Sequence, residues 1–192
     1  MTPSPAEAIV IGASAGALEA LSAILPTLPR DFAVPILVVV HVPPDRHSLL
    51  AELLRAKCLV AVKEAEDKEP IVGGTVYVAP PDYHLLVEVE RTLALSCDEP
   101  VLFSRPSIDV LFESAADAYG PALLAIVLTG ANQDGARGLQ AVVACGGAAL
   151  VQNPAGAFAP AMPEAAIHSV PGALVMSLDE IAATLQTMQA RK

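Results

Sequence analysis

The chain has 192 residues, a formal net charge of -10 and 54% hydrophobic residues. This composition excludes a disordered chain, and no apolar run reaches the roughly 20 residues that span a bilayer. The acidic charge and the absence of a Lys/Arg cluster exclude a typical nucleic-acid surface. Because the N-terminus also lacks the basic and apolar regions of a secretory signal, we expect a cytoplasmic protein that is not inserted in a membrane.

The N-terminal segment predicts a strand, a sharp turn and a helix. An apolar, β-branched run at residues 8–12 leads into Gly12 and Gly16, which bracket Ser14, and leucines at helical spacing follow. Residues 12–16 fit the G-x-S-x-G pattern of a nucleophile elbow, which exposes the serine hydroxyl beside helix N–H groups that could hold an oxyanion. A turn whose serine only caps the helix explains this pentapeptide equally well.

A second buried strand is predicted at residues 36–40. These residues are apolar on both faces, as in a parallel strand covered by helices. The strand ends at His41, and the Pro-Pro pair at residues 43–44 separates it from a helix that we expect to begin at Asp45.

The middle of the chain predicts further strands and a hairpin. A short strand at residues 59–62 precedes a charged segment, residues 63–69, which we expect to be a solvated loop. After an apolar run at residues 75–79, two alternating runs at residues 85–89 and 92–96 favour an antiparallel hairpin at the sheet edge.

The C-terminal half alternates between helices and strands. Pro106 is well placed as the first residue of a helix, and a doubly buried strand at residues 123–128 runs into a polar, Gly-bracketed loop that contains Asp134. The remaining predicted elements are a helix at 136–144, a strand at 148–151, a short helix near 163–168, a strand at 173–176 and a final helix from Leu178.

This alternation predicts a three-layer α/β/α fold in one domain, residues 1–192, with a doubly wound, mostly parallel sheet. Ligands bind outside the carboxyl ends of the strands in such sheets. Ser14, His41 and Asp134 each follow the carboxyl end of one of the three most apolar strands. We therefore expect them to meet as a catalytic nucleophile, base and orienting acid.

Other titratable residues are rivals for these roles. His47 is expected on a helix surface, and His168 at a helix C-terminus. His84, at the start of the hairpin, suits a contact at the rim of the site or with the substrate, and a structural hydrogen bond at least as well. Asp109 is the main rival acid, but it falls inside a predicted helix.

A phosphate-binding module is the alternative without catalysis, because a Gly-rich turn before a helix can hold phosphate. The spacing matches neither G-x-G-x-x-G nor a P-loop. We expect no cofactor and no metal, and we interpret Cys58, Cys97 and Cys145 as buried free thiols.

Several segments along nearly the whole chain also match one known family. They are residues 11–14, His41 with Pro43, and residues 76–80, 104–114, 128–130, 134–139 and 162–166. With these segments the sequence resembles the catalytic domain of the chemotaxis protein-glutamate methylesterases, CheB, from residue 9 to about residue 181. The resemblance implies hydrolysis of glutamyl methyl esters on the cytoplasmic helices of chemoreceptors, often with deamidation of glutamines.

The resemblance also implies that the catalytic triad falls on Ser14, His41 and Asp134. Backbone donors at Ala15 and Ala131 are then candidates for the oxyanion site. Arg105, which precedes the predicted helix, is a candidate cation for substrate binding, and a structural salt bridge of Arg105 is an equal alternative.

The chain departs from the family pattern around the site. The family has Thr-Gly-Gly after the serine where this chain has residues 15–17 (Ala-Gly-Ala), Gln where it has Val40, and Met-Gly where it has Ala131 and Asn132. These changes leave a general small-ester hydrolase as an alternative activity. Family members also commonly carry a receiver domain, which would not fit before residue 8. The chain is therefore either a catalytic domain isolated from a longer protein or a stand-alone homologue, for which a separate receiver or regulatory protein is a candidate partner.

Overall fold

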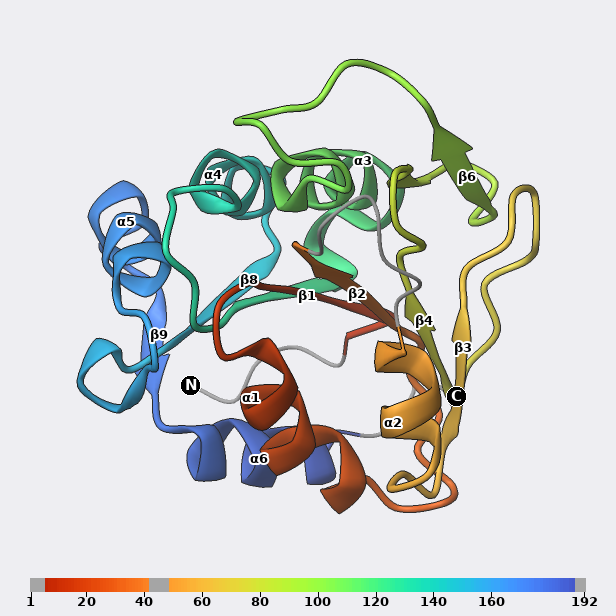
Figure 1. Ribbon diagram of the computed structural model, residues 1–192, viewed down its shortest axis with the longest axis horizontal. Coiled ribbons are helices and arrows are strands. Elements are labelled where there is room, and N and C mark those ends of the chain that lie inside the picture. The colour runs from red at the N-terminus through yellow and green to blue at the C-terminus, as the bar shows by residue number, and fades with distance from the viewer. Residues whose placement is uncertain (1–5, 42–48, 189–192) are drawn as a thin grey trace.

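A computed structural model describes residues 6–41 and 49–188 (Figure 1). The strands are β1 (Ala8–Ala13), β2 (Ile36–Val40), β3 (Ala61–Glu64), β4 (Thr75–Val78), β5 (His84–Val87), β6 (Leu93–Ser96), β7 (Leu123–Val127), β8 (Ala148–Gln152) and β9 (Leu174–Met176). The α-helices are α1 (Ala17–Ile24), α2 (Leu50–Arg55), α3 (Ile108–Tyr119), α4 (Ala136–Ala144), α5 (Ala161–Ser169) and α6 (Leu178–Gln186). The helix start expected at Asp45, and His47, lie outside the described residues.

Seven strands form one sheet in the order β3-β4-β2-β1-β7-β8-β9, and every neighbouring pair is parallel. After β1 the chain forms β2, β3 and β4 on one side, with β4 inserted between β2 and β3, and later β7, β8 and β9 on the other side. The strand order therefore reverses between β1 and β7, which is where such sheets bind ligands.

Helices cover both faces of the sheet, so the predicted three-layer fold is confirmed (Figure 1). Alternate residues of β1 point to opposite faces: Ile9 and Ile11 belong to the core under α1, α2 and α6, and Val10 to the core under α3 and α4. Burial on both faces explains why the central strands are apolar throughout. No helix within residues 6–41 and 49–188 is long and apolar enough to cross a membrane.

The hairpin is present as the antiparallel pair of β5 and β6, but it forms a separate two-stranded sheet. Its buried residues Leu85 and Val87 join the core that contains α3. The Val87 N–H also donates to Ser114 Oγ on α3, at 3.1 Å. Packing against this helix and backbone hydrogen bonds to residues 68–71, rather than pairing with the edge of the large sheet, fix the position of the hairpin.

Three local predictions need correction. The helix expected from Pro106 begins at Ile108, because Ser107 is still extended, with φ -108° and ψ 140°. Part of the charged segment at residues 63–69 pairs with β4 as the end of β3. The cysteines are free, but Cys97 and Cys145 are exposed and Cys58 is half-buried.

A close contact between α3 and α4 depends on Gly138. A Cβ at this position would lie 2.6 Å from Phe112 Cβ and 3.0 Å from Asp109 Cα. Gly138→Ala is therefore expected to destabilise the protein by about 1–3 kcal/mol, because neither helix can yield without disturbing the core. Gly156→Ala is the control, since nothing lies within 4 Å of its added Cβ. Urea unfolding of both variants measures the difference, and equal stabilities would contradict this account.

Candidate active site

The predicted site residues follow three neighbouring strands and therefore lie at one edge of the sheet. Ser14 follows β1, His41 follows β2, and Asp134 lies in the loop between β7 and α4. Because β1 lies between β2 and β7, the three carboxyl ends are adjacent. The site thus flanks the point at which the strand order reverses.

The turn that carries Ser14 is fixed by backbone contacts. The Ser14 N–H donates to Thr129 O at 2.9 Å, which joins the end of β1 to the end of β7. Gly16 has φ 82°, and a Cβ there would lie 2.6 Å from Phe158 Cβ. Conformation and space therefore both require glycine here, and the half-buried Ser14 is held between β1 and α1.

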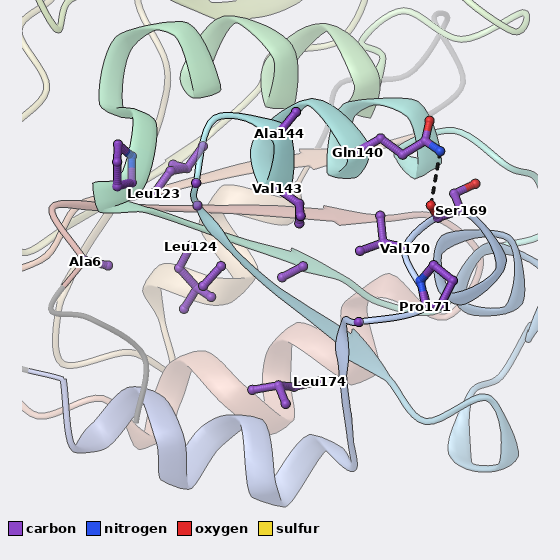
Figure 2. Close-up of a pocket in the computed structure, with 16 residues that line it drawn as sticks. Ala6, Leu123, Leu124, Gln140, Val143, Ala144, Ser169, Val170, Pro171 and Leu174 are labelled. Carbon is purple, nitrogen blue, oxygen red and sulfur yellow. Dashed lines mark hydrogen bonds between the residues drawn. The ribbon is translucent and has the colours of Figure 1, made fainter. Parts of the chain in front are cut away.

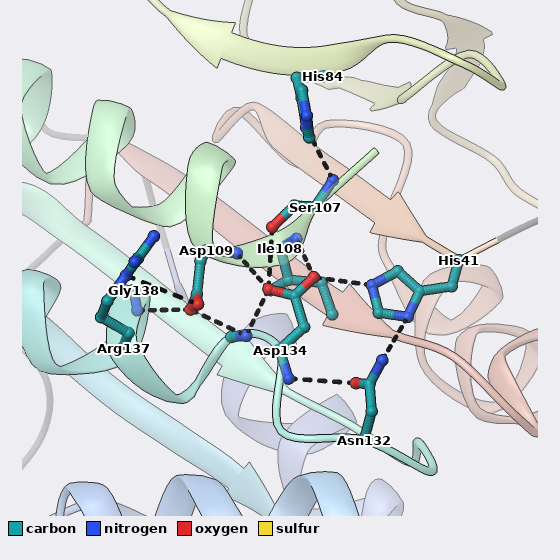
Figure 3. Close-up of polar contacts among 10 residues, drawn as sticks. His41, His84, Ser107, Ile108, Asp109, Asn132, Asp134, Arg137 and Gly138 are labelled. Atoms are coloured by element: carbon teal, nitrogen blue, oxygen red, sulfur yellow. Dashed lines mark hydrogen bonds and ion pairs between the residues drawn. The ribbon is translucent and has the colours of Figure 1, made fainter. Parts of the chain in front are cut away.

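His41 and Asp134 are in direct contact (Figure 3). The imidazole Nε2 lies 2.8 Å from Asp134 Oδ2, with the His41 side chain 12% exposed and the Asp134 side chain fully buried. A carboxylate accepts hydrogen bonds only, so Nε2 carries a proton and Nδ1 is the nitrogen that can accept one. Within the described residues, no hydrogen bond joins Ser14 Oγ to His41.

Asp134 also accepts hydrogen bonds from the N-terminus of α3. Its carboxylate accepts the Ile108 N–H at 2.7 Å, the Asp109 N–H at 3.0 Å and the Ser107 hydroxyl at 2.9 Å. The first N–H groups of a helix have no partner inside the helix, and they carry a partial positive charge. Asp134 thus holds the imidazole and α3 at the same time.

The rival acid Asp109 has a different role. Its Oδ1 accepts the N–H groups of Gly135 and Gly138, at 2.9 and 2.7 Å. Asp134, just before α4, therefore stabilises the start of α3, while Asp109, in α3, stabilises the start of α4. Within the described residues Asp109 makes no hydrogen bond to His41.

The two carboxyl groups differ in their pKa. Burial would raise the pKa of Asp134, but the hydrogen bonds from His41 and from the backbone of α3 outweigh it and bring this pKa below its ordinary value. Burial raises the pKa of Asp109, and the Gly138 N–H offsets this only in part. The hydrogen bonds to Asp134 thus favour the charged form of the carboxyl group beside the histidine.

Asn132 contacts the other nitrogen of the imidazole. Its Oδ1 accepts the Asp134 N–H at 3.1 Å, which orients the amide so that Nδ2 faces His41 Nδ1 at 3.4 Å. Because Nδ2 can only donate, this contact agrees with an unprotonated Nδ1. Asn132 and Ser107 were not predicted as site residues; an Asn two residues before an Asp in a Gly-bracketed loop was the available signal for Asn132.

The candidate oxyanion donors lie in the two loops beside these residues. Among the described residues, the N–H groups of Ala15 and Ala131 donate no hydrogen bond. The turn at Ala15 is fastened by its carbonyl, which accepts the Thr129 hydroxyl at 2.8 Å. Both N–H groups are therefore free to bind a negatively charged oxygen.

His84 and Arg105 are both engaged within the fold. Buried His84 accepts the Ser107 N–H at Nδ1 and donates from Nε2 to Glu99 O, both at 3.1 Å. Arg105 binds Asp82 Oδ1 through Nε and Nη2, at 3.1 and 2.6 Å, and the carbonyls of residues 97 and 98 through Nη1. These contacts favour the structural alternative for both residues.

An apolar cavity lies at the opposite edge of the sheet, by the amino ends of β7 and β8 (Figure 2). It measures about 830 Å³, and its lining contains no titratable side chain. The hydrogen bond from Gln140 Nε2 to Ser169 O, at 3.1 Å, is the polar contact drawn there. Hydrolytic chemistry needs titratable groups such as those around His41, so this cavity is not the candidate site. In the described part of the chain no cluster of three His, Cys, Asp or Glu could hold a metal ion.

Comparisons with known proteins agree on one family. The family model described as CheB methylesterase matches residues 9–185. A Leptospira interrogans protein named putative protein-glutamate methylesterase/protein-glutamine glutaminase is 49% identical over 176 residues, which are 92% of this chain and 91% of that protein. A Paramagnetospirillum magneticum relative named protein-glutamate methylesterase/protein-glutamine glutaminase 1 is 38% identical over all of this chain and 51% of its own length.

The solved structures include the Thermotoga maritima CheB methylesterase catalytic domain. It matches with a TM-score of 0.91 and 32% identity, over 96% of this chain and 99% of that domain. The similarity therefore covers the sheet, both helical layers and the loops that carry the site.

The lowered pKa of Asp134 predicts a pH-dependent stability. Because the pKa is lower in the folded than in the unfolded state, the stabilisation is fully present above about pH 5 and is lost as the pH falls through the folded pKa. Asp134→Asn is expected to lose on the order of 3 kcal/mol at pH 7. The difference from wild type should shrink toward pH 3, as measured by urea unfolding at several pH values.

Asp117→Asn is the matched control, because Asp117 is exposed on α3 and forms no ion pair among the described residues. A difference for Asp134→Asn that stays constant from pH 7 to pH 3 would show that the charge of Asp134 does not stabilise the fold.

Proposed function

Because the chain belongs to the CheB methylesterase family, we propose that it hydrolyses glutamyl methyl esters on the cytoplasmic helices of chemoreceptors and acts as one catalytic domain in the cytoplasm. The names of its relatives also support a protein-glutamine glutaminase activity. The contact between His41 and Asp134, at 2.8 Å beside the Ser14 turn, is the observation that carries this proposal.

In the proposed reaction, Ser14 Oγ attacks the ester carbonyl carbon while its proton moves to His41 Nδ1. The carbonyl electron pair moves onto oxygen, and the N–H groups of Ala15 and Ala131 stabilise the resulting charge. Asp134 stabilises the imidazolium through Nε2–H. When the C–O bond to the methoxy group breaks, the leaving oxygen takes the proton from Nδ1 and departs as methanol.

The acyl-enzyme is then hydrolysed. Water gives a proton to Nδ1 and attacks the acyl carbon, and Ser14 Oγ recovers the proton as the second intermediate collapses. The product is a receptor glutamate.

We also propose, from the family resemblance, that a separate receiver or other regulatory protein controls this activity.

The triad assignment predicts that Ser14→Ala and His41→Ala lower kcat by on the order of 10⁶, and that replacing Asp134 lowers it by about 10⁴. Methanol release from a methylated receptor preparation measures these rates. Ser22→Ala, on α1, removes a hydroxyl whose hydrogen bond within the described part of the chain comes from Lys57, and it should keep wild-type kcat. Wild-type-like turnover by Ser14→Ala would refute the assignment.

Arg105 tests whether a cation near the site recruits an acidic receptor surface. Because its donors bind Asp82 and two carbonyls, Arg105→Ala is expected to lower Tm and to reduce kcat/KM equally for a receptor fragment and for a small uncharged ester. Arg30→Ala, which removes the same charge from an exposed residue, is the control. A loss confined to the receptor fragment would instead assign Arg105 to substrate binding.

The same two substrates separate receptor demethylation from general ester hydrolysis in the wild-type protein. Receptor-directed activity predicts a much higher kcat/KM for the receptor fragment. Equal values would favour a general small-ester hydrolase.

A further inference from the structure

The amide of Asn132 lies where the leaving group must receive its proton. His41 Nδ1 accepts the serine proton, and the same atom returns it to the leaving group, so the leaving atom has to come within hydrogen-bond distance of Nδ1. Asn132 Nδ2 is 3.4 Å from Nδ1 (Figure 3). A leaving atom that binds Nδ1 on the side facing Asn132 is therefore within reach of the Asn132 amide.

The orientation of this amide is fixed. Asn132 Oδ1 accepts the Asp134 N–H at 3.1 Å, so turning the amide over would place two donors against each other. Asn132 therefore presents N–H groups, and no acceptor, to the leaving group. The contact with Nδ1 is long enough to be exchanged for a closer acceptor on the substrate.

The leaving group of an ester and that of an amide interact differently with the Asn132 donor. In the tetrahedral intermediate the methoxy oxygen has two lone pairs, one for the proton from Nδ1 and one for Asn132 Nδ2–H. The nitrogen of a glutamine has a single lone pair, which Nδ1–H takes, and its remaining N–H groups face the Asn132 donor. A donor left without an acceptor is costly where the bound substrate excludes water.

We propose that Asn132 is a specificity-determining residue that favours methyl-ester over glutamine substrates through a hydrogen bond to the leaving oxygen. This proposal rests on the proposed function and adds to it a preference between the two activities. Asn132 occupies one of the positions at which this chain departs from the family pattern.

The test compares two receptor fragments that differ only in carrying a glutamyl methyl ester or a glutamine at one position. Methanol release and the formation of deamidated fragment give kcat/KM for each. The ratio of ester to amide kcat/KM is expected to fall about tenfold in Asn132→Ala, because only the ester loses a hydrogen bond. A purely structural role would lower both rates and leave the ratio unchanged.

Two further variants test whether the donor itself causes the change in the ratio. Asn132→Asp keeps an oxygen for the Asp134 N–H but removes the donor, so its ratio should fall at least as far as that of Asn132→Ala. Gln133→Ala, at the exposed neighbouring residue, should keep the wild-type ratio. Ratios within twofold of wild type in both Asn132 variants, with methanol release still dependent on Ser14, would overturn the inference. Wild-type protein that releases no methanol at all would refute the proposed function instead.

Discussion

The site depends on one buried carboxylate and its set of donors. Asp134 would be costly to bury alone, but it receives hydrogen bonds from the imidazole, from the Ser107 hydroxyl and from the backbone at the start of α3. Those donors are fixed by the helix, so the carboxylate has one orientation. The imidazole bound to it is held in one tautomer, in which Nδ1 carries no proton.

Much of this arrangement could be predicted from local sequence. Apolar runs identified the central strands, and the rule that parallel strands place their carboxyl ends together brought Ser14, His41 and Asp134 to one edge. The contacts of Ser107 and Asn132 could not be predicted, because they depend on how α3 and the Asp134 loop approach each other across the fold. The alternation of β5 and β6 likewise showed that each strand has one buried face, without showing that α3 covers it.

The reciprocal capping of α3 and α4 links the site to the packing of two helices. Asp134 binds the backbone of α3, Asp109 binds the backbone of α4, and Gly138 allows the helices to approach closely enough for both. The first-turn N–H groups of each helix thus receive a carboxylate from the neighbouring segment. A shift of either helix would move the acid that orients His41.

The order of the site residues along the chain has a consequence for biosynthesis. His41 precedes Asp134 by 93 residues, and the α3 backbone that stabilises Asp134 also lies between them. A nascent chain therefore exposes the serine and the histidine long before their acid has been translated. Until β7 has entered the sheet beside β1, the imidazole has no carboxylate to orient it. Under the proposed assignment, a partly synthesised chain therefore hydrolyses esters far more slowly than the finished protein.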